Sequence, residues 1–175
     1  MSGHNKWSKI KNKKAATDSQ KSKVFSKLVK LIQNESKASK GNIDSPSLKA
    51  AIEKAKKANM PSDNIDRAVK KGTTDDTVME EMVYEAYGPG GVAMIIIGLS
   101  NNKNKTAQEV RHALTKNGLS LAGNGSASWA FTKVGAEYEP QTMTEVSEAD
   151  GEKLDAVIED LEDLEDVQDV YTNAE

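Results

Sequence analysis

In the first seventy residues of the chain, apolar positions recur at helical spacing in three stretches. Between Asp18 and about Lys40 the intervals are three and four residues, which lines the apolar side chains along one face of a helix. The residues on this face are Val24, Phe25, Leu28, Val29, Leu31 and Ile32. Ser45 before Pro46 indicates the start of a second helix, with serine as cap and proline in the first turn. A third, short helix is expected between a capping Ser62 and a terminating Gly72, so this half is predicted to be a three-helix module.

The second half of the chain has a different pattern, in which strands and helices mix. An alternating segment, Met82–Ala86, is followed by the turn "YGPGG" and by Val92–Leu99, which is so apolar that a central strand is expected. Helical stripes follow at residues 107–114, where Asn104 or Thr106 is the expected cap, and at residues 148–162 after Ser147. Three more strands are expected: residues 124–135, where Trp129 and Phe131 alternate, residues 136–146, and residues 166–173. The order β-β-α-β-β-α-β favours a ferredoxin-like sheet with an added hairpin strand.

These patterns predict an α+β protein. The N-terminal three-helix module is followed by a ferredoxin-like α/β sandwich, an antiparallel sheet with two helices on one face. The expected divisions are a basic flexible arm over residues 1–17, a three-helix basic domain over 18–75, and an acidic ferredoxin-like domain over 76–175.

The charge of the chain is divided between these two halves. The formal net charge is only −3, from 24 Lys and Arg against 27 Asp and Glu. Residues 1–72 hold 18 of the basic and 6 of the acidic residues, a net +12, and residues 73–175 hold the other 6 and 21, a net −15. Such asymmetry indicates a basic module that meets a polyanion, and an acidic module of separate character.

The opening segment "MSGHNKWSKIKNKKAATDSQKSK" concentrates the positive charge. Lysine runs are often only solubilising, but here they lead into a helix that carries further lysines, including Lys27 and Lys30. Trp7 could stack on a nucleic-acid base, or with Ile10 it could hold the arm against the helices. Arginine is absent from the arm, so contacts to phosphate are expected rather than reading of base edges.

Enzyme chemistry finds little support in the residues. The two histidines, His4 and His112, form no recognisable catalytic motif, and there is no cysteine. The acids of "EDLEDLEDVQD" are typical of a solvated surface, and "YGPGG" is followed by a strand where a phosphate-binding loop would lead into a helix. We therefore expect no enzyme, no metal, no cofactor and no small-molecule substrate. The longest apolar run, Val92–Ile97, is too short to cross a bilayer, so a cytoplasmic protein without membrane contact is expected.

Several segments, taken together and in order, resemble the YebC family of probable transcriptional regulatory proteins. They are "GHNKWSKIKNKKAATDSQKSKVFSKL", "AIEKAKKANMPSDNIDRAVKKG", "YEAYGPGGVAMII", "NKNKTAQEVRHALTKNG", "GSASWAF" and "DVQDVYTNAE". Family members typically have three domains, the third inserted within the second. In this chain "FTKVGAEYEPQ" passes directly from one strand to the next, so the resemblance is to a short member that lacks the inserted domain.

The resemblance implies a cytoplasmic nucleic-acid-binding regulator of gene expression, and the residue pattern leaves its target open. The first hypothesis is a transcriptional regulator that binds DNA mainly through the lysine-rich arm and helices. The second is an RNA- or ribosome-binding translation factor that assists elongation at difficult sequences, and the third is an interaction module whose acidic domain binds a basic protein. The third helix offers only Asn64, Arg67 and Lys70 for reading bases, which argues against strong sequence selectivity. The candidate nucleic-acid contacts are Lys6, Trp7, Lys9, Lys11, Lys13, Lys14, Lys21, Lys23 and Lys27.

Overall fold

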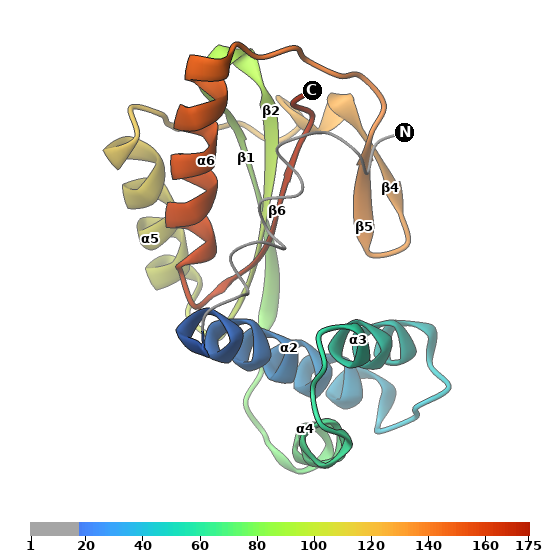
Figure 1. Ribbon diagram of the computed structural model, residues 1–175. Helices are drawn as coiled ribbons and strands as arrows, with labels where there is room; N and C mark the ends of the chain where they lie inside the picture. The colour runs from blue at the N-terminus through green and yellow to red at the C-terminus, as the bar shows by residue number, and fades with distance from the viewer. Residues whose placement is uncertain (1–17) are drawn as a thin grey trace. The chain divides into compact units, whose positions relative to one another are not determined.

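The computed structural model describes residues 18–175, which form two compact units, one of residues up to Met79 and one of Glu80–Glu175. The first unit is helical, and the second combines helices with antiparallel strands, so the predicted α+β class is confirmed (Figure 1). Among the helices of residues 18–175, none is long and apolar enough to span a bilayer.

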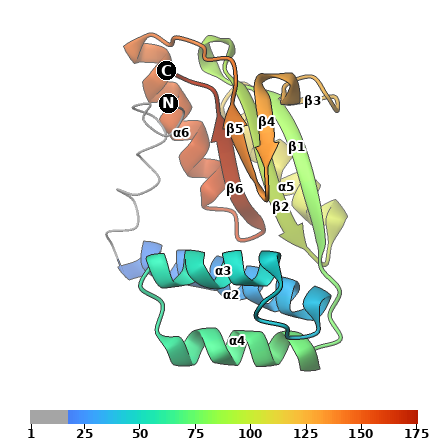
Figure 2. The same cartoon turned by 90° about the vertical axis from the view of Figure 1, so that its right-hand side faces the viewer.

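The helical unit is built on one long helix. It contains α2 (Asp18–Ser39), α3 (Pro46–Lys57) and α4 (Ser62–Thr74). Both shorter helices pack against α2 and contact each other much less, as the separation of α3 from α4 in Figure 2 shows. The buried apolar residues of its core are Leu28, Ile32, Leu48, Ala51, Ala55, Met60, Ile65 and Ala68. Several of these are small, so the core is held largely by close helix approach rather than by large buried area.

Gly72 does not end its helix, contrary to the sequence-based expectation, because α4 continues to Thr74. A Cβ atom at this position would lie 2.5 Å from the carbonyl oxygen of Gln33 and 2.7 Å from the Cβ atom of Ser36. The hydroxyl of Ser36 donates to the carbonyl oxygen of Val69 at 2.6 Å across the same contact. Glycine is therefore required where α4 crosses α2, and not for a turn.

The second unit follows the predicted alternation of strands and helices. Its strands are β1 (Glu80–Tyr87), β2 (Ala93–Ser100), β3 (Leu121–Ala122), β4 (Phe131–Val134), β5 (Glu137–Pro140) and β6 (Val167–Thr172). Its helices are α5 (Lys103–Lys116) and α6 (Glu148–Glu162), with short 3₁₀ turns η2 (Pro89–Gly91) and η3 (Ser128–Ala130). The hairpin between β1 and β2 is the predicted turn, closed by the amide of Gly88, which donates to the carbonyl of Val92 at 2.7 Å.

The main sheet is antiparallel, with the strand order β3-β1-β2-β6. Helices α5 and α6 cover one face of it, and together they enclose the largest core cluster of the unit (Figure 1). Every residue of β2 is buried, as its apolar sequence predicted for a central strand. Because α5 leads from β2 to β3 while β1 lies between them, the sheet has the split β-α-β arrangement of ferredoxin-like folds.

The other face of the sheet is covered by β4, β5 and η3, which lie on the side opposite the helices in both views (Figures 1 and 2). The expected third and fourth strands thus pair only with each other and form a separate two-stranded sheet. The edge of the main sheet is taken by the short β3, which the sequence did not predict, and Trp129 lies in η3 rather than in a strand. Only Gly135 and Ala136 join β4 to β5, so no inserted domain separates these two strands.

The cap of α5 is also different from the expected one. The side chain of Asn102 accepts the amide of Lys105 at 3.1 Å, ahead of both residues proposed from the sequence, Asn104 and Thr106. Ser147 caps α6 as expected, and its hydroxyl oxygen accepts the amide of Asp150 at 3.1 Å. An acceptor at this position satisfies an amide that has no partner inside the helix.

Candidate nucleic-acid interface

Three lysines lie along the face of α2 that is turned away from the helical core. Lys23, Lys27 and Lys30 are separated by four and three residues, so they follow one another on one side of the helix. The buried Leu28 and Ile32 lie on the opposite side. We call Lys23, Lys27 and Lys30 the α2 lysine row. Point charges at this spacing along a rigid rod suit the phosphates of a nucleic-acid backbone.

The predicted contact residues divide into three groups. Lys23 and Lys27 belong to the α2 lysine row, whereas Lys21 precedes Leu28 by two helical turns and lies on the side of the core residues. Lys21 is nevertheless exposed, because the core begins further along the helix. The remaining predicted contacts, Lys6, Trp7, Lys9, Lys11, Lys13 and Lys14, lie outside the described residues.

Lys37, two turns beyond Lys30 on α2, has a structural role instead. Its ammonium group donates to the carbonyl oxygens of Asp75 at 3.1 Å and Thr77 at 2.8 Å. Asp75 in turn accepts the amide of Thr77 at 2.8 Å, and this hydrogen bond lowers the pKa of the Asp75 carboxyl. These contacts fix the segment that leaves α4, so Lys37 is not a candidate phosphate contact.

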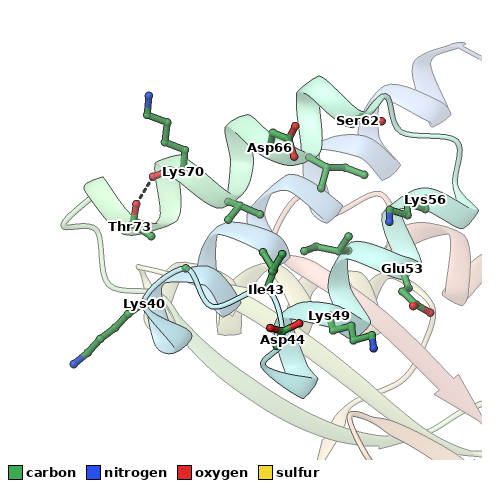
Figure 3. A pocket seen from close by; sticks show the side chains of 14 residues that line it. Lys40, Ile43, Asp44, Lys49, Glu53, Lys56, Ser62, Asp66, Lys70 and Thr73 are labelled. Atoms are coloured by element: carbon green, nitrogen blue, oxygen red, sulfur yellow. Dashed lines mark hydrogen bonds between the residues drawn. The ribbon is translucent and has the colours of Figure 1, made fainter.

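The helical unit also contains a groove between α3 and α4, which the sequence analysis did not anticipate. Its volume is ≈ 730 Å³, and its apolar side chains are Ile43, Ile52, Ile65 and Val69. Figure 3 shows the charged side chains around it, where lysines alternate with acids. The lysines are Lys40, Lys49, Lys56 and Lys70, and the acids are Asp44, Glu53 and Asp66. Because the acids offset most of this positive charge, the groove is a poorer phosphate site than the α2 lysine row.

Two of the three side chains of α4 that could read bases, Asn64 and Arg67, are already bonded within the helix. Arg67 donates through Nη2 to Oδ1 of Asn64 at 2.6 Å and through Nε to the carbonyl of Asp63 at 3.3 Å. The Nε and Nη2 donors of Arg67 and the Oδ1 acceptor of Asn64 would have to leave their present partners before these atoms could pair with a base edge. Weak sequence selectivity stays a prediction, and the hydrogen bond between Arg67 and Asn64 supports it.

The acidic segment after α6 is less solvated than its sequence suggested. Asp166 is buried, accepts the hydroxyl of Thr106 at 3.0 Å and lies 3.6 Å from the ammonium of Lys105. The charges of Asp166 and Glu109 raise the pKa of Lys105. Asp166 thus links β6 to the start of α5. Within residues 18–175 no group of three histidine or acidic side chains is placed to hold a metal ion.

Comparisons with known proteins identify relatives over most of the chain. The family model of the TACO1/YebC protein N-terminal domain matches residues 5–75, and that of the TACO1/YebC second and third domain matches residues 79–137 and 134–174. The two parts of the second match meet at residues 134–137, where β4 turns into β5.

Curated relatives from bacteria carry the name probable transcriptional regulatory protein. One from Fervidobacterium nodosum is 48% identical over 165 residues, which are 92% of this chain and 66% of the relative. One from Thermotoga petrophila is 45% identical over 179 residues, covering 100% of this chain and 71% of the relative. The crystal structure of a conserved hypothetical protein from Aquifex aeolicus has a TM-score of 0.78 and 29% identity, over 90% of this chain and 91% of that chain. The chain therefore belongs to the TACO1/YebC family.

Proposed function

We propose that the protein is a cytoplasmic, non-catalytic nucleic-acid-binding regulator of gene expression, and that it binds DNA mainly through the lysine-rich N-terminal arm and the α2 lysine row. The observation that carries the proposal is the alignment of Lys23, Lys27 and Lys30 on the face of α2 opposite its buried residues. The whole helical unit adds to it, since residues 18–79 hold 13 Lys and Arg against 8 Asp and Glu, a net +5. The names of the relatives, probable transcriptional regulatory proteins, support a regulatory role.

RNA within the ribosome is the second candidate target. Lysine contacts to phosphate do not distinguish DNA from RNA, since both backbones present the same charged groups. The hydrogen bond between Arg67 and Asn64 favours backbone binding over base reading and fits either target. A translation factor that assists elongation at difficult sequences would use the same basic surface.

The α2 lysine row is tested by replacing Lys23, Lys27 and Lys30 together with glutamine. Removing three cations that face phosphates should weaken binding to a short DNA duplex about tenfold or more at roughly 0.1 M salt. Log affinity decreases with log salt, and this dependence should become less steep by about 0.9 for each lysine that pairs with a phosphate in the wild-type complex. Fluorescence anisotropy with a labelled duplex measures both quantities.

The matched control replaces three lysines that stand among acids beside the groove, Lys40, Lys49 and Lys56. Their replacement by glutamine should change the affinity by less than about threefold. The proposal for α2 fails if the control and the triple variant weaken binding equally, because net charge alone would then explain the effect. Deletion of residues 2–17 tests the arm in the same assay, and an unchanged affinity there would remove the arm from the site.

The choice between DNA and RNA is tested by crosslinking in cells and sequencing the attached nucleic acid. Enrichment of promoter fragments supports the transcriptional role, and enrichment of ribosomal RNA supports the translational one. Either recovery should disappear in the triple glutamine variant. Recovery that persists in the variant would show that another surface makes the contact.

A further inference from the structure

An exposed pair of aromatic side chains lies on the α/β unit, far in sequence from the lysines. Trp129 is 56% exposed and Tyr87 is 38% exposed, although large aromatic side chains are usually buried. The indole N–H of Trp129 donates to the hydroxyl oxygen of Tyr87 at 2.9 Å and to the carbonyl of Ser126 at 2.8 Å. The hydroxyl of Tyr87 donates to the same carbonyl. The polar edges of both rings are thus bonded within the protein, and what remains for a partner is carbon surface.

The loop that carries Trp129 is fixed from below by Glu85 of β1. The Glu85 carboxylate accepts the amides of Gly125 at 2.7 Å, Ala127 at 3.0 Å and Ser128 at 2.6 Å. Gln141 adds a bond from its amide to the carbonyl of Trp129 at 3.3 Å. The indole is therefore held in place before any partner arrives, which lowers the entropy cost of binding.

Glu85 also brings a negative charge to this place. Its side chain is only 6% exposed, and burial acts to raise its pKa, but the three amide hydrogen bonds outweigh burial and the pKa lies below the ordinary value. The carboxyl is accordingly ionised at neutral pH. The donors of these three hydrogen bonds are uncharged backbone amides, which hold the carboxylate without cancelling its charge. Tyr87 follows Glu85 by two positions on β1 and therefore lies on the same face of the sheet.

The net charge of the whole α/β unit has the same sign. Residues 80–175 hold 6 Lys and Arg against 19 Asp and Glu, a net −13. A field of this sign attracts a cationic partner and repels a phosphate backbone. Exposed aromatic faces bind cations through their quadrupole, and arginine does so more often than lysine.

We propose that Trp129 and Tyr87 form a docking site for an arginine-containing basic segment of a partner protein, in which a guanidinium stacks on the exposed aromatic rings above the Glu85 carboxylate. The site is separate from the α2 lysine row and does not depend on the proposed nucleic-acid function. A nucleobase could stack on the same rings, but it would bring its phosphates into a net charge of −13. The acidic charge therefore selects the cation.

The experiment uses the full chain and two fluorescein-labelled octapeptides, one alternating arginine with glycine and one alternating lysine with glycine. Fluorescence anisotropy at about 0.15 M salt should give tighter binding of the arginine peptide. Trp129→Ala should weaken that binding about five- to tenfold and reduce the preference for arginine over lysine. Trp129→Phe should retain part of the affinity, because phenylalanine has an aromatic face but no indole. Val134→Ala, which shortens another exposed apolar side chain of this unit, is the control and should change nothing.

Uniform replacement of tryptophan by fluorinated tryptophan tests the cation contact without removing the ring. Fluorine withdraws electron density from the ring face, so the arginine peptide should bind several-fold more weakly. The same replacement in the Trp129→Ala background should have no effect, which assigns the weakening to Trp129 rather than Trp7. Melting temperatures establish that each variant is folded.

Three results would overturn the proposal. The first is equal binding of the arginine peptide by the wild-type protein and Trp129→Ala. The second is an affinity that fluorination leaves unchanged. The third is binding of a short oligouridylate that Trp129→Ala abolishes while peptide binding persists, which would assign the rings to a nucleobase.

Discussion

At the scale of single residues, the Glu85 carboxylate determines the course of the loop over residues 125–128. It accepts three backbone amides from that loop, and amides left without a partner in a buried place are costly. Glu85→Gln should destabilise the protein by about 1–3 kcal/mol at neutral pH, because the amide group has one fewer acceptor oxygen and no charge. Urea denaturation followed by tryptophan fluorescence measures the destabilisation.

The stabilisation by Glu85 should depend on pH in a defined direction. Its pKa in the folded protein lies below the ordinary value of 4.5, so ionisation favours the folded state above that pH. The difference in unfolding free energy between the wild type and Glu85→Gln should be full at neutral pH and shrink as the pH falls below 4.5. Glu81→Gln is the matched control, since Glu81 lies on the same strand and the same face but is exposed. A gap between wild type and Glu85→Gln that does not change down to acid pH would contradict this assignment.

At the scale of elements, the crossing of α2 and α4 depends on the absence of a side chain at residue 72. Gly72→Ala would place a Cβ atom 2.5 Å from a backbone oxygen of α2, and a backbone atom cannot move aside as a flexible side chain can. The expected cost is about 1–3 kcal/mol of stability, although alanine favours helices more than glycine does. Thermal unfolding provides the measurement. Thr73→Ala, at the exposed next position, should stay within about 0.5 kcal/mol, and an equal destabilisation in both variants would mean that α4 does not pack as described.

The elements that the sequence predicted well are those whose pattern is local. The face of α2 from Leu28 to Ile32, the cap of α6 at Ser147 and the apolar run of β2 all follow from neighbouring residues. The turn at Trp129 does not, because its shape depends on the carboxylate of Glu85, which is 43 positions away from Ser128 in the sequence. The alternation of Trp129 with Phe131 is typical of a strand, and no neighbouring residue indicates the turn that Glu85 holds.

In the candidate site too, the features that depend on local spacing were predictable and those that depend on tertiary packing were not. Helical spacing was enough to align Lys23 with Lys27, and the same spacing, applied strictly, separates Lys21 from them. The groove between α3 and α4 could not be read from the sequence, because it exists only where two helices meet a third at a distance from each other. That the row binds nucleic acid stays a prediction, for which the triple glutamine variant is the test.

At the scale of the whole molecule, the opposite charges of the two units predict two binding activities that mutations can separate. The net charge is +5 for residues 18–79 and −13 for residues 80–175, so each unit attracts the class of ligand that the other repels. Replacing Lys23, Lys27 and Lys30 with glutamine should weaken binding of the DNA duplex and change the affinity for the arginine peptide by less than about twofold, since the two proposed sites share no residue. Trp129→Ala should have the reverse effect.

A variant that carries Trp129→Ala together with the three glutamine substitutions at Lys23, Lys27 and Lys30 makes this separation quantitative. If the two sites are independent, the decrease in binding free energy measured for each ligand should equal that of the corresponding single variant within about 0.5 kcal/mol, as for mutations without shared partners. Anisotropy titrations of each ligand alone avoid direct association between the basic peptide and the duplex. A Trp129→Ala protein whose DNA affinity falls as strongly as that of the lysine variant would mean that the rings belong to the nucleic-acid site. In that case the net charge of the α/β unit would not determine its ligand, because a polyanion would bind to a unit that is itself negatively charged.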